Sequence, residues 1–212
     1  ISTIMFNWIA HFFAFYLIAN VLTDPQRGER TIAISESARL TRFFPDATLN
    51  SGLLISLVTV VVIFFLLWRT STGFEIRSAG YNPHASHYAG ISIRKQVLRV
   101  FLIGGAIAGL AGAIVVMGRP PYYAVLSGLP QLVNLGFDGI GVAMIGRNHP
   151  IGIVFAAIFF GGLMTGGRIM QFDPGVPFEL VRVIQGIIIL ALAIPELRRL
   201  FSLARERLSG RK

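Results

Sequence analysis

Two pairs of polar side chains lie close enough in the sequence to act together. His84 and His87 are three residues apart, and Asn7 and His11 are four apart. Residues at either spacing share one face of a helix. Two histidines on one face can bind a metal ion, but a stable site needs further ligands, and no cysteine or carboxylate lies beside His84 and His87. We therefore expect no metal site.

Isolated polar residues in apolar segments are further candidates for a chemical role. Asn7 and Gln185 lie in such segments. In a bilayer, polar groups of this kind face the protein interior or a water-filled path. A hydrogen bond between helices is the alternative role. Asp138 has no oppositely charged neighbour, so it either contacts a substrate or caps a short helix that begins at Gly139.

Motifs of hydrolytic enzymes are absent from the sequence. It contains no G-x-x-x-x-G-K-[ST] phosphate-binding loop, no H-E-x-x-H pattern, no serine elbow and no paired carboxylates. We therefore expect a chain that is not an enzyme, with no catalytic residue and no cofactor. A conduit or a subunit of a helical bundle fits this sequence better.

A polar stretch between two apolar runs, Thr70–Gln96, carries its own helix signals. Asn82 is a good N-cap, and Pro83 suits the first helical position because its missing N–H would be unpaired there. The residues His84–Ala89 can complete about two turns, and Gly90 can adopt the left-handed conformation that ends a helix. A plain connector needs only a few residues. We therefore predict that this capped helix contacts another molecule.

The composition indicates a membrane protein. Of the 212 residues, 54% are hydrophobic and 14% are charged, whereas a soluble domain has about 25% charged residues. Long apolar runs predict transmembrane helices. The predicted spans are 3–22, 51–68, 100–118, 151–165 and 178–194, with a shorter apolar segment at 136–146. We predict an all-α, polytopic transmembrane helical bundle.

The segment 136–150, GFDGIGVAMIGRNHP, does not fit a regular span. The apolar part between Asp138 and Arg147 has about ten residues, whereas a helix needs about 20 to cross the membrane core. Four glycines also weaken a helix here. Irregular backbone at membrane depth is tolerated only where protein or water covers it. We predict a broken or re-entrant segment.

The distribution of basic residues predicts the orientation. The net charge is +9, and Lys and Arg collect in the cytoplasmic loops of membrane proteins, so nucleic acid is not needed to explain it. The excess lies in the stretch 70–96 and in the amphipathic tail 195–212, which we predict to be cytoplasmic, the tail on the lipid surface. The loops 23–50 and 119–135 are then outside.

Three stretches together resemble the permease subunits of bacterial ABC importers. They are RTSTGFEIRSAGYNPHASHYAGI at 69–91, GFDGIGVAMIGRNHPIGIVFAAIFFGGL at 136–163 and VPFELVRVIQGIIIL at 176–190. The chain is similar to the branched-chain amino acid/ribose permease superfamily, and within it to nucleoside and simple-sugar permeases that work with a basic-membrane-lipoprotein type receptor. Permeases of this family are longer, so we expect a partial permease.

The resemblance implies a subunit that imports a nucleoside through the bacterial inner membrane, with ATP hydrolysed by a separate ATPase. It also implies a second permease subunit, like or unlike this one, and an extracytoplasmic substrate-binding lipoprotein. In such importers a short cytoplasmic helix docks in a groove of the ATPase and transmits its closure. The residues at that position are Asn82, Pro83, His84, Ala85, Ser86, His87, Tyr88, Ala89 and Gly90.

A nucleoside is neutral and polar, so its path needs amide, hydroxyl and aromatic contacts. The candidates are Asn7, Trp8, Asn134 and Gln185, together with Asp138. A simple sugar such as ribose or galactose is the alternative cargo, which the motifs separate only weakly. An ion-coupled carrier would need buried acids at the membrane midplane, where only Asp138 comes near. A non-transporting scaffold would need neither the segment 136–150 nor the capped helix.

Overall fold

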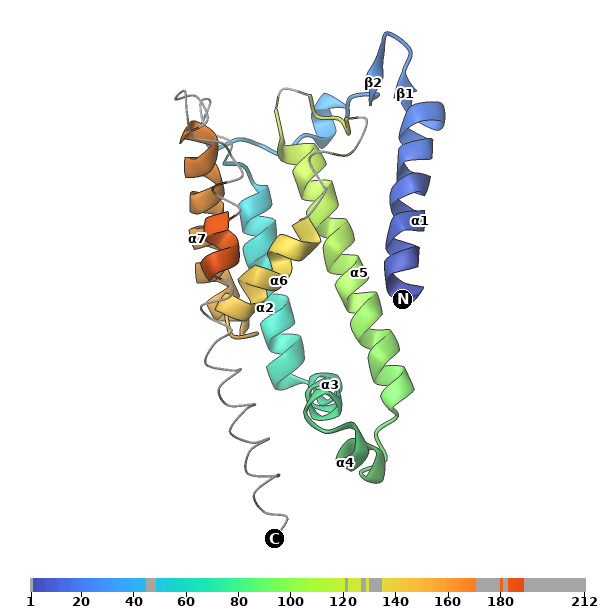
Figure 1. The fold of residues 1–212 in the computed structure, drawn as a ribbon, viewed down its shortest axis with the longest axis vertical. Coiled ribbons are helices and arrows are strands. Elements are labelled where there is room, and N and C mark those ends of the chain that lie inside the picture. The colour runs from blue at the N-terminus through green and yellow to red at the C-terminus, as the bar shows by residue number, and fades with distance from the viewer. Residues whose placement is uncertain are drawn as a thin grey trace. The chain divides into compact units, whose positions relative to one another are not determined.

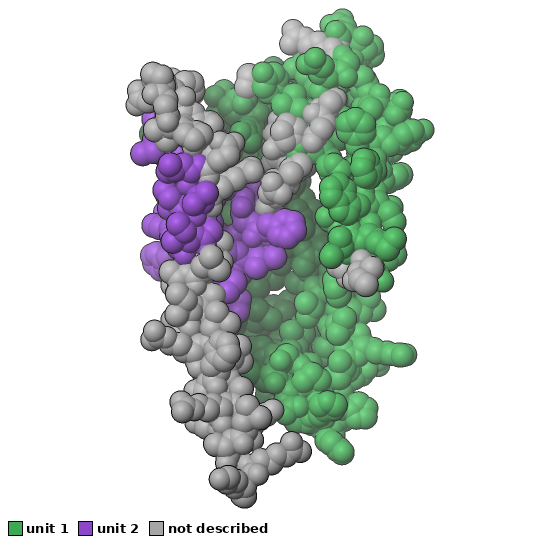
Figure 2. Space-filling model, viewed as in Figure 1, with its two compact units in different colours: residues 1–133 green, residues 134–212 purple. Residues whose placement is uncertain are grey.

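The computed structural model describes residues 2–44, 49–120, 122–126, 129, 135–170, 180 and 183–188. The chain divides into two compact units, 1–133 and 134–212 (Figure 2). Unit 1 contains α1 (Ser2–Tyr16) with its π-helical continuation η1 (Leu17–Val21), β1 (Thr23–Asp24), β2 (Arg27–Thr31), the 3-10 turn η2 (Glu36–Ala38), α2 (Gly52–Arg69), α3 (Ser71–Tyr81), α4 (Pro83–Tyr88) and α5 (Ile93–Gly118) (Figure 1). Unit 2 contains α6 (Leu135–Ile145) and α7 (Pro150–Met170).

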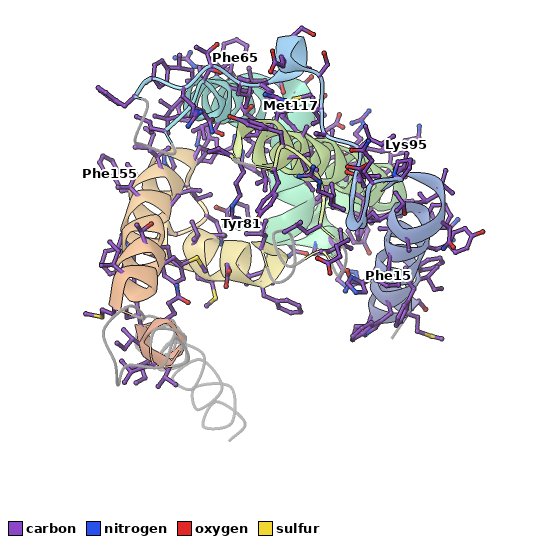
Figure 3. All side chains as sticks on the ribbon, turned by 90° about the horizontal axis from the view of Figure 1, so that it is seen from above. Phe15, Phe65, Tyr81, Lys95, Met117 and Phe155 are labelled. Atoms are coloured by element: carbon purple, nitrogen blue, oxygen red, sulfur yellow. The ribbon has the colours of Figure 1, made fainter. Side chains whose placement is uncertain are left out.

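Four helical segments of the described chain are long and apolar enough to cross a membrane: Ile4–Val21, Gly52–Arg69, Ile93–Gly118 and Pro150–Gly167. A helix satisfies its own backbone hydrogen bonds, as a spanning segment must. Large apolar side chains project from these helices, among them Phe65, which is 61% exposed (Figure 3). The all-α, polytopic fold is thus confirmed. Of the predicted span 178–194 only 180 and 183–188 are described, as helix, and the tail 195–212 lies outside the described residues.

A small antiparallel hairpin, β1–β2, follows α1. The segment 122–126 lies along β2, because the amide of Thr31 donates to the carbonyl oxygen of Val125 at 3.0 Å and the amide of Val125 donates to the hydroxyl oxygen of Thr31 at 3.1 Å. The guanidinium of Arg39 lies 4.6 Å from the ring centroid of Tyr123. The two loops predicted to be outside, 23–50 and 119–135, therefore meet in the structure. The hairpin was not expected from the sequence.

The helices α2 and α5 run antiparallel. Asn50, just before α2, hydrogen-bonds to Gly118 at the end of α5, while Glu75, just after α2, contacts Arg99 near the start of α5. In unit 1, α3 and α4 therefore lie at one end of α5 and the hairpin at the other (Figure 1). The stretch 70–96, predicted to be cytoplasmic, thus lies at the opposite end of α5 from the hairpin in the loop 23–50, predicted to be outside. Which of these two ends faces the cytoplasm stays a prediction from the charge distribution.

The segment around residue 140 is a short continuous helix, α6, whose glycines do not interrupt it. The chain turns after it, where Arg147 and Asn148 adopt left-handed backbone angles of φ 53° and 54°. Eleven residues extend about 16 Å, short of the roughly 30 Å of a membrane core. A re-entrant path stays a prediction. Asp138 lies in the first turn of α6, which begins at Leu135, so the predicted cap of a helix starting at Gly139 is wrong.

Candidate functional site

The short helix α4 begins with the cap that the sequence predicts. The side-chain oxygen of Asn82 accepts a hydrogen bond from the amide of Ala85 at 3.1 Å, and Pro83 occupies the first helical position. The cap satisfies an amide that would otherwise be free at the helix start. A helix of only six residues depends on such caps, because short helices are marginal in water.

The other end of α4 is closed by a two-bond glycine motif. The amide of Gly90 donates to the carbonyl oxygen of His87 at 3.0 Å, and the amide of Ile91 donates to that of Ser86 at 2.9 Å. This pattern needs a left-handed residue, and Gly90 has φ +80°. Both ends of α4 are therefore fixed by local chemistry.

The surface of α4 is almost entirely exposed. Ser86 is its one buried residue, whereas Tyr88 is 93% exposed and Tyr81, just before the helix, is 90% exposed. His84 and His87 are exposed too, and the described residues hold no group of three or more side chains that could bind a metal ion. Exposed aromatic side chains at a fixed position are typical of binding surfaces.

A tight joint connects α2 to α3. The hydroxyl of Thr70 donates to the carbonyl oxygen of Leu66 at 2.5 Å and accepts from the amide of Gly73 at 3.1 Å. A side chain on Gly73 would collide with the carbonyl oxygens of Leu66 and Leu67, so only glycine permits this approach. The helix α3 therefore starts in a fixed direction from the end of α2.

A second connection joins α3 to α5. The side chains of Gln96 and Arg99 both donate to one carboxylate oxygen of Glu75, at 2.7 and 2.8 Å. Gln96 is buried, with 4% of its surface exposed. The sequence did not predict this network, because Gln96 and Arg99 lie 21 and 24 residues from Glu75 and because α3 was not expected as a helix. The one available signal was Glu75, the single acid among five bases.

The bases of this region divide into two groups. Arg99 pairs with Glu75, and Arg77 lies with its guanidinium 5.2 Å from the ring centroid of Trp68. The exposed bases are Arg69, Arg94 and Lys95. The end of unit 1 that carries α4 therefore presents a positive surface.

The residues predicted for a substrate path do not form one group in the structure. Asn7 and Trp8 are exposed on α1 of unit 1, where the Trp8 ring stacks on Phe12 with centroids 5.9 Å apart. Asp138 and Gln185 belong to unit 2, and Asn134 lies outside the described residues. Asp138 is half-buried, and no described residue forms a hydrogen bond or ion pair with its carboxylate.

Gln185 is the path candidate with the most informative environment. It is 5% exposed, and its side-chain nitrogen has no hydrogen-bond partner in the described part of the chain. Buried polar groups are almost always hydrogen-bonded. An unpartnered buried amide is therefore a better candidate for a ligand contact than the exposed Asn7 and Trp8.

Several known proteins similar to this chain are named as permeases of ABC transporters. The family described as the permease component of the branched-chain amino acid transport system matches residues 1–193. The guanosine ABC transporter permease protein NupP of Bacillus subtilis is 42% identical over 198 residues, which cover 91% of this chain and 56% of the relative. The nucleoside ABC transporter permease protein NupB of Lactococcus lactis is 36% identical over 204 residues, covering 92% and 55%.

A sugar permease is similar over a shorter stretch. The glucose ABC transporter permease protein TsgB13 of Haloferax volcanii is 34% identical over 150 residues, covering 71% of this chain and 38% of the relative. The chain thus spans about half the length, or less, of these curated relatives. No solved structure matches the chain.

Proposed function

Because the chain belongs to the family of permease components of branched-chain amino acid transport systems, we propose that it is part of the membrane-spanning permease of an ATP-driven importer. Its long apolar helices and its family make it a multi-pass protein of the bacterial cell membrane. ATP is hydrolysed by a separate ATPase subunit. The rest of the importer comprises a second permease subunit and an extracytoplasmic substrate-binding lipoprotein.

The cargo that we propose is a nucleoside. Two relatives that each align with more than nine-tenths of this chain are named for guanosine and for nucleosides. The glucose permease aligns with 71% of it at 34% identity, which keeps a simple sugar as the alternative cargo. A neutral polar cargo needs hydrogen-bond donors that carry no charge. The buried side-chain nitrogen of Gln185, which has no hydrogen-bond partner among the described residues, supplies such a donor.

The ATPase docks at α4. The observation that carries this proposal is that α4 is a capped and exposed helix, linked through α3 to the apolar helix α2 and through Ala89–Ser92 to the apolar helix α5. Its caps at Asn82 and Gly90 hold its shape. Tyr81 and Tyr88 present large aromatic surfaces beside it, and aromatic anchors dominate the energetics of interfaces.

Uptake measurements test the cargo. A bacterial strain lacking the full-length gene is compared with the same strain carrying a restored gene, using radiolabelled guanosine, other nucleosides, ribose and glucose. Loss of nucleoside uptake alone, restored by the gene, supports the proposal. Loss of sugar uptake alone assigns the importer to sugars, and unchanged uptake of every compound contradicts both cargoes.

A further inference from the structure

Three side chains form a closed network across the turn that carries α4. The side-chain nitrogen of Gln96 donates to the Glu75 carboxylate at 2.7 Å, and the guanidinium of Arg99 donates to the same oxygen at 2.8 Å. Arg99 also donates to the side-chain oxygen of Gln96 at 3.4 Å. Each side chain therefore contacts the other two, which restricts their movement more than one pair would.

Glu75 is the centre of this network. One of its oxygens accepts both of the short bonds. Gln96 is only 4% exposed, so loss of the Glu75 carboxylate would take away the acceptor of its buried side-chain nitrogen, which is costly. The side chains of Arg99 and Glu75 are 42% and 37% exposed, and water weakens an ion pair of that exposure. The strength of the network comes from its buried member.

The helix α3 is also fixed to α2 on its other side. The Thr70 hydroxyl and the amide of Gly73 form the joint between the two helices, and Arg77 of α3 lies over the ring of Trp68 of α2. Only Asn82 separates α3 from α4, and Ala89–Ser92 separates α4 from α5. A displacement of α4 therefore reaches α3 directly.

We propose that Glu75 is a positioning residue whose network with Gln96 and Arg99 makes α2, α3 and α5 respond as one body to a partner bound at α4. This inference rests on the proposed function, in which the partner is the ATPase. Coupling between distant sites is carried by packed elements and hydrogen-bonded networks. Without the network, α3 pivots against α5, and the movement of α4 is no longer transmitted to both α2 and α5.

Transport per ATP tests the network. The full-length permease is reconstituted in vesicles with its ATPase, second subunit and binding protein, and substrate uptake, ATP hydrolysis and retention of the ATPase are measured. Glu75→Ala is expected to lower uptake per ATP roughly fivefold, the lower end of the cost of leaving the buried side-chain nitrogen of Gln96 unpaired, while retention and hydrolysis stay unchanged. Glu75→Arg combined with Arg99→Glu restores uptake per ATP.

A matched control distinguishes the network from ion pairs in general. Glu36 and Arg39 form an ion pair of 3.3 Å within one turn, and it joins no two helices. Glu36→Ala is expected to leave uptake per ATP unchanged. An equal loss in Glu36→Ala and Glu75→Ala would overturn the proposal, as would loss of the bound ATPase in Glu75→Ala, because the network would then serve only to form the docking surface.

A covalent link between positions 75 and 99 tests the connection between α3 and α5 itself. If Glu75 served only local folding, such a link would not restore uptake per ATP. Residues 1–212 contain no cysteine, and any cysteine elsewhere in the full-length permease is first replaced by serine, so that Glu75→Cys with Arg99→Cys introduces two defined thiols. A short bis-thiol cross-linker is expected to restore uptake per ATP in that variant, and no recovery despite complete cross-linking overturns the proposal. Gly90→Val distinguishes failure of the docking proposal from failure of the network proposal. Normal uptake in both Gly90→Val and Glu75→Ala would exclude the docking role of α4. Normal uptake in Glu75→Ala alone would exclude only the role of the Glu75 network.

Discussion

The side-chain amide of Asn50 donates a hydrogen bond of 2.9 Å to the carbonyl oxygen of Gly118. The same side chain accepts a bond of 2.9 Å from the amide of Gly52. One residue thus satisfies free backbone groups at the start of α2 and at the end of α5. Gly118 also has no room for a side chain, because it would collide with Asn50. The pair holds the two helices together at the end opposite to α4.

Asn50→Leu is expected to destabilise the protein. Two backbone groups lose their partner in a partly buried place, which costs about 1–3 kcal/mol. Thermal unfolding of the purified full-length protein in detergent measures the effect as a lower Tm. Thr59→Val is the control, because its hydroxyl bonds only to the carbonyl oxygen of Ile55 one turn back in the same exposed helix. Equal Tm values for the two variants would contradict the role of Asn50.

Gly73→Ala is expected to disrupt the joint between α2 and α3. The new methyl group meets backbone atoms of Leu66 and Leu67, which cannot move aside as a side chain could. Gly80→Ala is the matched control on the same helix, since a side chain there meets nothing within 4 Å. That change is expected to stabilise α3 by about 0.5–1 kcal/mol, through its higher helix propensity. Thermal unfolding of both variants measures the difference, and a stable, active Gly73→Ala protein would show that the joint is not tight.

Gly90→Val is expected to uncouple ATP hydrolysis from transport while the subunit still inserts in the membrane. A β-branched residue at φ +80° strains the end of α4 by roughly 1–2 kcal/mol. Gly90→Asn should keep most of the coupled uptake, because asparagine tolerates the left-handed conformation. Uptake and hydrolysis in reconstituted vesicles measure both effects. Normal coupling in Gly90→Val would exclude a docking role for α4.

Tyr88→Ala is expected to weaken binding of the ATPase without affecting the fold. The side chain is 93% exposed in the chain, so its loss removes almost no internal packing. Truncation of an aromatic anchor at an interface costs about 2 kcal/mol or more, which is roughly 30-fold in affinity. Retention of the ATPase during purification and the Tm of the permease are measured together. An unchanged affinity would place the docking contact elsewhere.

Gln185→Leu is expected to raise the substrate concentration needed for half-maximal uptake by about tenfold, the effect of one lost hydrogen bond to a ligand. The Tm without substrate should not fall, because the buried nitrogen of Gln185 has no partner among the described residues. A lower Tm with unchanged uptake would instead assign Gln185 to a structural hydrogen bond between helices.

Local chemistry made parts of this structure predictable. The cap at Asn82 and the stop at Gly90 depend only on neighbouring residues, and both are found. The apolar spans follow from composition, although α5 begins at Ile93, seven residues before the predicted boundary at 100. Its first two turns contain Arg94, Lys95, Gln96 and Arg99, so hydropathy alone could not include them.

Long-range contacts were not predictable in the same way. The helix α3 carries Gly73 and Gly80 and has no continuous apolar face, so the sequence gives little sign of it. Its place depends on the joint with α2 and on Glu75, whose partners are more than 20 residues away. The pairing of β2 with 122–126 likewise joins residues 94 apart. Such contacts follow from how elements distant in the sequence come together in the fold, which composition does not specify.

Site-directed cross-linking from α4 to the ATPase tests the central claim most directly. A photoactivatable cross-linker is attached at Tyr88→Cys on α4 and, as the control, at Glu29→Cys in the hairpin at the opposite end of α5, in membranes that contain the whole importer. We predict a cross-link to the ATPase from position 88 and none from position 29. A cross-link from position 29 with none from position 88 would contradict both the docking helix and the orientation of the chain.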